Sequence, residues 1–217
     1  MTTVSTVMAR ARLRLNEQDS TTFHGDEDFV LYADEAQKYV AKTSECLQQK
    51  STTLTVADQA DYAVPDDFIV MKRLLVEGKR ARPINFEQID DEGLEESNIT
   101  SSGKYFYYIF ADELTIVPTP SAVDLPIKLY YVRIPATLTL LTSSLEIPEY
   151  LEDSLVAYMT YCAWLKDIEY ELADYNLAEC NAKIALNKRQ VYERDADSQS
   201  AIKFGQSTDR RRPLEGV

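Results

Sequence analysis

Apolar positions near the N-terminus recur every three or four residues, as on one face of a helix. This spacing predicts a helix over residues 2–16 and a second helix over residues 26–49. The apolar stripe of the second helix alternates spacings of four and three residues: Phe29, Ala33, Ala36, Val40, Thr43 and Leu47. Such a stripe is typical of a helix that packs nearly antiparallel against another helix.

The same periodicity returns in the C-terminal third of the chain. Pro148 stands at the start of a strongly apolar segment, and proline is favoured in the first turn of a helix. The stripe of this predicted helix consists of Leu151, Leu155, Tyr158, Cys162 and Leu165. A break over residues 166–171 leads to a fourth predicted helix over residues 172–194, after which the periodicity is lost.

Between these helical pairs the pattern changes to the alternation of β-strands. We predict strands at residues 51–56 and 127–134. Two hairpins are predicted between them, one from residues 69–76 and 80–84 and one from residues 104–110 and 114–117. The expected class is therefore α+β: a four-helix bundle of two N-terminal and two C-terminal helices, a β-rich insertion between the pairs, and an extended C-terminal arm. The expected boundaries are 1–50 and 138–196 for the bundle helices, 51–137 for the insertion and 197–217 for the arm.

Charge narrows the range of partners. The chain carries a net charge of −13, and a protein this acidic is not expected to grip duplex DNA over a broad face, because phosphate binding needs lysine and arginine. The two ends of the chain are more basic than the rest, which indicates that they dock on acidic neighbours. For such subunit or neighbour contacts we single out three arginines of the first helix and three strand tyrosines: Arg10, Arg12, Arg14, Tyr105, Tyr107 and Tyr130. A solvated helix face and packing within the sheet are the plainer interpretations of these two sets.

Few residues suggest catalysis or metal binding. His24 is the only histidine, so neither a Ser-His-Asp arrangement nor a zinc site can be built in the usual way. The acids that follow it fit the negatively charged first turn of a helix. Cys46, Cys162 and Cys180 fall on apolar helix positions and are expected to be buried free thiols. We therefore expect no enzyme, no cofactor and no metal, and no uncharged segment is long enough to span a bilayer.

Several ordinary segments together form a resemblance to a known family. They are Ala33–Gln37 in the second helix, Tyr62-Ala-Val-Pro65 before the first hairpin, Leu114-Thr-Ile-Val-Pro118-Thr-Pro120, Leu129-Tyr-Tyr131 to Ile134-Pro135, and Ile147-Pro148-Glu-Tyr150 opening the apolar helix. In this order, over about residues 1–195, the chain resembles the head–tail adaptor proteins of tailed bacteriophages, which are also called connector or head-completion proteins.

The resemblance implies a structural virion protein without catalytic residues. Such adaptors form a ring, usually a dodecamer, beneath the portal, and they connect the DNA channel to the tail. The implied location is the neck of the virion, with synthesis in the bacterial cytoplasm. The implied partners are further copies of the chain, the portal protein, a tail nozzle or tail-tube protein, and duplex DNA that passes without specific binding. Two alternatives stay open: a tail-tube or tail-completion component, and a cytosolic binding module that uses the acidic stretch 87–96 or the aromatic strands.

The C-terminal arm has its own composition. It lacks apolar periodicity, yet it combines isolated apolar side chains with a run of three arginines. We interpret it as an arm that folds on binding, and the resemblance implies that its partner is the portal. The expected contact residues are Phe204, Arg210, Arg211, Arg212 and Leu214.

Overall fold

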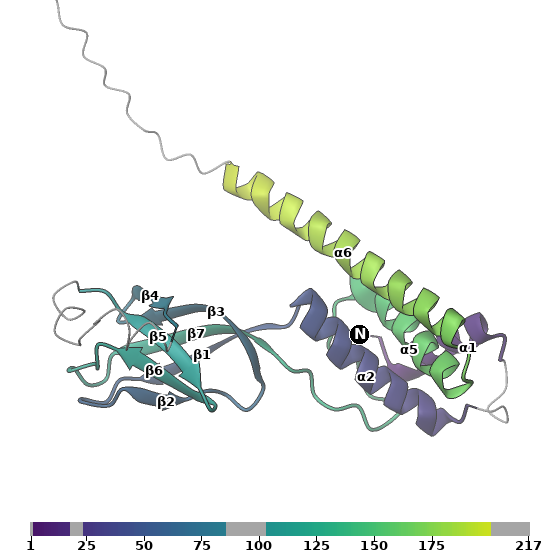
Figure 1. The fold of residues 1–217 in the computed structure, drawn as a ribbon, viewed down its shortest axis with the longest axis horizontal. Helices are drawn as coiled ribbons and strands as arrows, with labels where there is room; N and C mark the ends of the chain where they lie inside the picture. The colour runs from purple at the N-terminus through teal and green to yellow at the C-terminus, as the bar shows by residue number, and fades with distance from the viewer. Residues whose placement is uncertain (1, 18–23, 86–102, 201–217) are drawn as a thin grey trace, which may run out of the picture.

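The computed structural model describes residues 2–17, 24–85 and 103–200, with side chains up to residue 189. Four α-helices lie in this part of the chain: α1 (Val4–Leu15), α2 (Asp26–Ser44), α5 (Glu152–Lys166) and α6 (Tyr170–Ser200). A short 3-10 helix, η1 (Glu149–Leu151), precedes α5. Together these elements form the helical body, which lies beside a separate sheet body along the long axis of the molecule (Figure 1).

Seven strands form the sheet body. They are β1 (Gln48–Leu54), β2 (Asp61–Ala63), β3 (Phe68–Val76), β4 (Lys79–Pro83), β5 (Phe106–Phe110), β6 (Glu113–Val117) and β7 (Pro126–Arg133). Their order in the sheet is β1-β7-β3-β4-β5-β6-β2. The β4–β5 pair is parallel and the other pairs are antiparallel, so the sheet is mixed. It curls into a half-barrel whose inner face is apolar.

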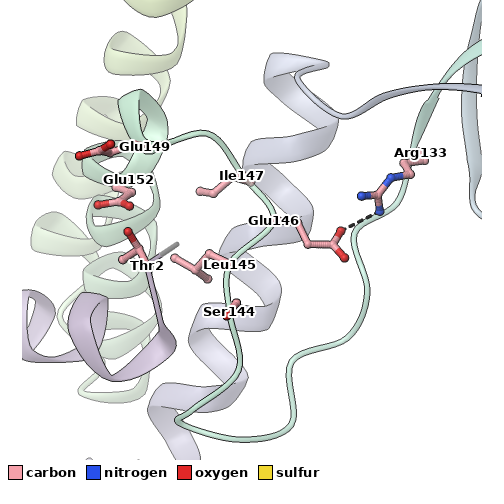
Figure 2. Close-up of a pocket in the computed structure, with 8 residues that line it drawn as sticks. All are labelled: Thr2, Arg133, Ser144, Leu145, Glu146, Ile147, Glu149 and Glu152. Atoms are coloured by element: carbon pink, nitrogen blue, oxygen red, sulfur yellow. Dashed lines mark hydrogen bonds and ion pairs between the residues drawn. The ribbon is translucent and has the colours of Figure 1, made fainter.

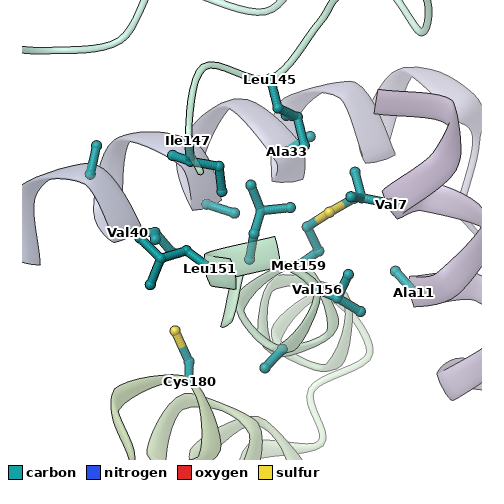
Figure 3. Packing of buried hydrophobic residues seen from close by; sticks show 14 of the residues in the cluster. Val7, Ala11, Ala33, Val40, Leu145, Ile147, Leu151, Val156, Met159 and Cys180 are labelled. Carbon is teal, nitrogen blue, oxygen red and sulfur yellow. The ribbon is translucent and has the colours of Figure 1, made fainter. Parts of the chain in front are cut away.

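The helical core is built from the predicted stripes. Phe29, Ala33, Ala36 and Val40 of α2 are fully buried, and Leu155 of α5 is buried among them. Figure 3 shows α2, α5, α1 and α6 converging on this cluster, with Val7, Met159 and Cys180 pointing into it. Burial of so many aliphatic side chains supplies the main stabilisation of this body.

The expectation of a four-helix bundle with a β-rich insertion is wrong. The strands form one curled sheet with a hydrophobic cluster of its own, which includes Leu74, Leu114, Ile116, Ile127 and Tyr131 and shares no residue with the helical cluster. The sheet is thus a second body rather than an appendage of a bundle. Periodicity showed which face of each segment is buried, but it does not say which other element covers that face.

Two helix ends also differ from the expectation. The second helix ends at Ser44 instead of residue 49, because Glu45 adopts a left-handed conformation (φ 57°) and the chain enters β1 at Gln48. The last helix continues to Ser200, beyond the predicted end at residue 194. The acidic stretch 87–96 and most of the predicted arm lie outside the described residues.

Candidate functional site

The arginines of α1 form ion pairs within the chain, with Arg10 and Arg14 on one side of the helix and Arg12 on the other. Arg12 is only 7% exposed, and its Nη2 donates to Asp26 Oδ1 at 2.9 Å and to the carbonyl of His24 at 3.2 Å. Its guanidinium lies 4.7 Å from the centroid of the Phe29 ring, within range of a cation–π contact. Arg12 therefore fastens the start of α2 to α1.

The other two arginines of α1 reach the C-terminal helices. Arg10 pairs with Glu152 at 3.3 Å and also with Asp153, and Arg14 pairs with Glu179 at 3.3 Å. Pairs as exposed as these contribute at most about 1 kcal/mol each. A role of Arg10, Arg12 and Arg14 in subunit contacts stays a prediction, to be weighed against these intramolecular partners.

His24 joins the start of α2 to the end of α5. The ring is fully buried, with Nε2 lying 3.3 Å from Asp167 Oδ2 and Nδ1 lying 3.3 Å from the hydroxyl of Tyr32. Nearby, the backbone N–H of Gly25 donates to Asp28 Oδ2 at 2.8 Å, which confirms that the acids after His24 serve the first turn of α2. The ammonium of Lys166, 2.9 Å from the same Asp28 oxygen, is the main cause that lowers the pKa of Asp28.

A polar cleft of about 620 Å³ lies where the segment 134–148 passes between α2 and the start of α5 (Figure 2). It is lined by Thr2, Arg133, Ser144, Leu145, Glu146, Ile147, Glu149 and Glu152. Glu146 faces Arg133 across the cleft, with Nη1 2.7 Å from Oε2. The sequence did not indicate this cleft, because its walls come from segments far apart in the chain. Its polar lining consists of two hydroxyls, Thr2 and Ser144, three carboxylates, Glu146, Glu149 and Glu152, and the guanidinium of Arg133.

The cysteine thiols are poor nucleophiles in this structure. Cys162 and Cys180 are buried and free, as predicted, whereas Cys46 is half-buried just after α2. Burial raises the pKa of Cys162 and of Cys180 to about 12, with the Glu35 carboxylate adding to the effect at Cys162. A thiol with such a pKa stays protonated at neutral pH, and the reactive form is the thiolate.

The three tyrosines predicted to make contacts occupy different environments. Tyr107 is 8% exposed and belongs to the core of the sheet body. Tyr105 is half-buried against that core, and burial, followed by its hydrogen bond to Glu77, raises its pKa to about 12. Tyr130 is half-buried in β7. A contact role for Tyr105, Tyr107 and Tyr130 stays a prediction, and of the three Tyr107 has the least surface to offer a partner.

The predicted portal-binding residues Phe204, Arg210, Arg211, Arg212 and Leu214 lie outside the described part of the chain. Within residues 2–17, 24–85 and 103–189, no cluster of histidine, cysteine, aspartate and glutamate is suited to a metal ion. No described helix combines the length and apolarity that crossing a membrane requires.

Comparison with known proteins places the chain in a family. A comparison with curated proteins finds no match to this sequence. A family model described as SU10 adaptor protein matches residues 2–213, nearly the whole chain. This match confirms the resemblance to phage adaptors seen in the sequence. The chain therefore belongs to the SU10 adaptor protein family and is a bacteriophage adaptor, a structural protein.

Proposed function

We propose that this protein is the head-to-tail adaptor of its virion: a ring, of twelve copies in the pattern of such adaptors, that lies under the portal, connects it to the tail and lines the DNA ejection channel. The family match over residues 2–213 is the observation that carries this proposal. Its partners would be the portal protein above, a tail nozzle or tail-tube protein below, and duplex DNA inside. The role is structural, and no step of it requires a reactive side chain.

Two properties of the chain support this role. The net charge of −13 suits a conduit for DNA, since like charges keep the phosphate backbone from adhering to the wall. The helix α6 runs out beyond the other helices, and it ends at Ser200, directly before the predicted arm in the sequence (Figure 1). An arm that continues from a projecting helix is well placed to reach a neighbouring protein.

The attachment to the portal is the step to test. We expect a chain that ends at Gln199 to keep its fold, because the hydrophobic core of the helical body ends at Ile184, and to bind portal rings more weakly than the full chain. The triple variant R210S/R211S/R212S should weaken binding in the same direction, since arginine pairs strongly with carboxylates. Co-sedimentation with portal rings at matched salt measures both effects.

A matched control lies within the same segment. The variant Q206A/S207A removes polar side chains without changing charge, and it should bind portal rings as the wild type does. If the chain that ends at Gln199 binds portal rings as well as the wild type does, the proposal that the arm binds the portal is wrong. If the full chain ignores portal rings and instead caps tail tubes, the protein is a tail-completion component.

A further inference from the structure

Five cations share one face of the sheet. The side chains of Leu74, Ala81 and Leu129 point into the sheet core, and the register Leu74↔Ala81 and Leu74↔Leu129 places their neighbours in each strand on the opposite face. The pairing Ser51↔Leu129 extends the same alternation to β1. The outward positions therefore include Lys50 in β1, Lys128 in β7, Arg73 in β3, and Arg80 and Arg82 in β4, which we call the basic face.

The charge of the basic face is uncompensated by the strands around it. No acidic residue occupies an outward position of β1, β7, β3 or β4, and no described residue forms an ion pair with any of the five cations. Lys50, Arg73, Arg80 and Arg82 are exposed. Half-buried apolar side chains lie between the cations: Leu75, Phe106 and Tyr130. A surface that mixes cations with apolar side chains in a protein of net charge −13 is suited to an acidic protein partner.

A surface of complementary character lies at the turn between α5 and α6. Four large apolar side chains there are unusually exposed: Ile168 (69%), Tyr170 (62%), Leu172 (43%) and Tyr175 (68%). Glu169, Glu171 and Asp174 are interspersed with them and are exposed as well. None of these three carboxylates forms an ion pair with a described residue. We call residues 168–175 the acidic corner.

The basic face and the acidic corner cannot meet within one copy. The corner adjoins the start of α2, where Lys166 pairs with Asp28, whereas the end of α2 adjoins the sheet, where Lys72 pairs with Glu45. The 19 residues of α2 separate these two points by about 28 Å, at about 1.5 Å per residue. Figure 1 shows the sheet at one end of the molecule and the α5–α6 turn at the other. A contact between the two surfaces therefore needs two molecules.

We propose that the basic face of one copy binds the acidic corner of the next copy. The contact would bring five cations to three carboxylates and would cover the apolar side chains on both sides. Because the two surfaces differ, the contact is heterologous, and repetition of it gives a closed ring or an open filament. This inference rests on the proposed ring and identifies the surfaces through which the ring is built.

The phosphate backbone of DNA is the rival occupant of the basic face. Arg80 and Arg82 line an open cleft of about 520 Å³ together with Pro83 and Lys104, which has room for a phosphate group. DNA binding through several phosphates would, however, hold the genome in place, since each phosphate contact adds to affinity. The apolar side chains among the cations also have no counterpart on a phosphate backbone. These two points favour the protein partner.

A charge exchange between the two surfaces tests the proposal. Self-association of the wild type is measured by sedimentation velocity and native mass spectrometry, alone and in the presence of portal rings. We expect R80E/R82E and E169K/E171K each to lower the assembled fraction at least tenfold. The four-fold variant R80E/R82E/E169K/E171K should recover assembly, because it restores opposite charges across the contact. A variant that merely misfolds cannot be rescued in this way.

The variant K42E/K188E is the matched control, since it changes the net charge by the same amount as R80E/R82E but lies on the helical body, and it should assemble like the wild type. Normal assembly of R80E/R82E would overturn the proposed contact while leaving the ring in place. A wild type that stays monomeric, even with portal rings, would overturn both the contact and the ring. Loss of duplex binding in R80E/R82E, with assembly unchanged, would instead assign the basic face to DNA.

Discussion

At the scale of single residues, the buried thiols have the clearest thermodynamic effect. Cys162 is 7% exposed and Cys180 is fully buried in the helical body. The pKa of each is raised from the ordinary 9.0 to about 12. The folded protein therefore keeps these protons to a higher pH than the unfolded chain does, so the thiols stabilise the fold below pH 9 and lose that contribution as the pH rises toward 12.

We predict a loss of unfolding free energy on going from about pH 8 to about pH 10, of roughly 1.4 kcal/mol for each of the two thiols. Buried tyrosines such as Tyr131, whose pKa is raised from 10.0 to about 12, add a smaller loss that begins as the pH approaches 10 and grows above it. Urea denaturation at both pH values measures the change. The double variant C162A/C180A should lose less stability over this interval, by the contribution of the two thiols, and an equal loss in both proteins would contradict the assignment to the thiols.

Arg12 and His24 show what sequence reasoning could not reach at this scale. The residue types after His24 were enough to predict the charged first turn of α2. The burial of Arg12 was not predictable, because an arginine on a helix is normally solvated. It is buried only where an acidic or hydrogen-bonding group of the fold pairs with it. That partner, Asp26, comes from the next helix, and the Asp167 that lies beside His24 comes from a turn more than a hundred residues later.

At the scale of elements, the segment 134–148 depends on polar anchors from α2 rather than on regular structure. Gln37 is fully buried, and its Nε2 donates to the carbonyl of Ala136 at 3.2 Å while its Oε1 accepts from the backbone N–H of Glu146 at 2.9 Å. One turn earlier, Asp34 Oδ1 accepts from the N–H of Leu138 at 2.9 Å. These bonds hold the segment, and one wall of the cleft, against α2.

We predict that Gln37→Leu lowers the unfolding free energy by about 2 kcal/mol, because two backbone groups lose their partners. Hydrogen exchange should also show faster exchange of the Glu146 amide in particular. A general loss of packing would instead raise the exchange rates of many amides. The control Gln59→Leu removes an exposed side-chain bond to the carbonyl of Asp61 and should change stability by less than about 0.5 kcal/mol. An unchanged exchange rate of the Glu146 amide in the Gln37 variant would show that Gln37 does not hold the segment 134–148 against α2.

Helices and strands were largely predictable, whereas their ends and partners were not. The hairpins and the stripe of α2 follow from periodicity alone. The turn at Glu45, which ends α2 early, is set by the pairing of β1 with β7, a strand about eighty residues later in the chain. Tertiary pairing of this kind overrides local propensity, which is why residues 45–49 were assigned to the helix.

At the scale of the whole molecule, the projecting end of α6 stands out. The helix has 31 residues and is about 46 Å long. Among its side chains described up to residue 189, the buried ones are Ala173, Asn176, Cys180 and Ile184, and Leu186 is 57% exposed. An isolated helix segment gains little stability from its own hydrogen bonds, so we expect the projecting end of α6 to be stabilised by contacts with other molecules.

We therefore predict that the amides of residues 187–200 exchange fast in the free protein and become protected on assembly with portal rings. The amides of residues 173–184, which are packed in the core, should be slow in both states. Hydrogen exchange with mass spectrometry measures both segments in one experiment, so the core segment serves as the internal control. Equal exchange of the projecting segment in the free and assembled protein would mean that it meets no partner.

The two ion pairs at the boundary between the bodies have a mechanical consequence. The chain crosses between the bodies twice, near Glu45 and near Arg133, and each crossing carries a charged contact, Lys72 with Glu45 and Arg133 with Glu146. The apolar clusters on either side share no residue, and the joint also carries two backbone hydrogen bonds, from the N–H of Arg133 to the carbonyl of Leu47 at 2.9 Å and from the N–H of Ile134 to the carbonyl of Asp67 at 2.7 Å. Salt weakens such contacts. We therefore expect the joint to become less stiff as the ionic strength rises, because its two charged contacts weaken while its backbone hydrogen bonds stay.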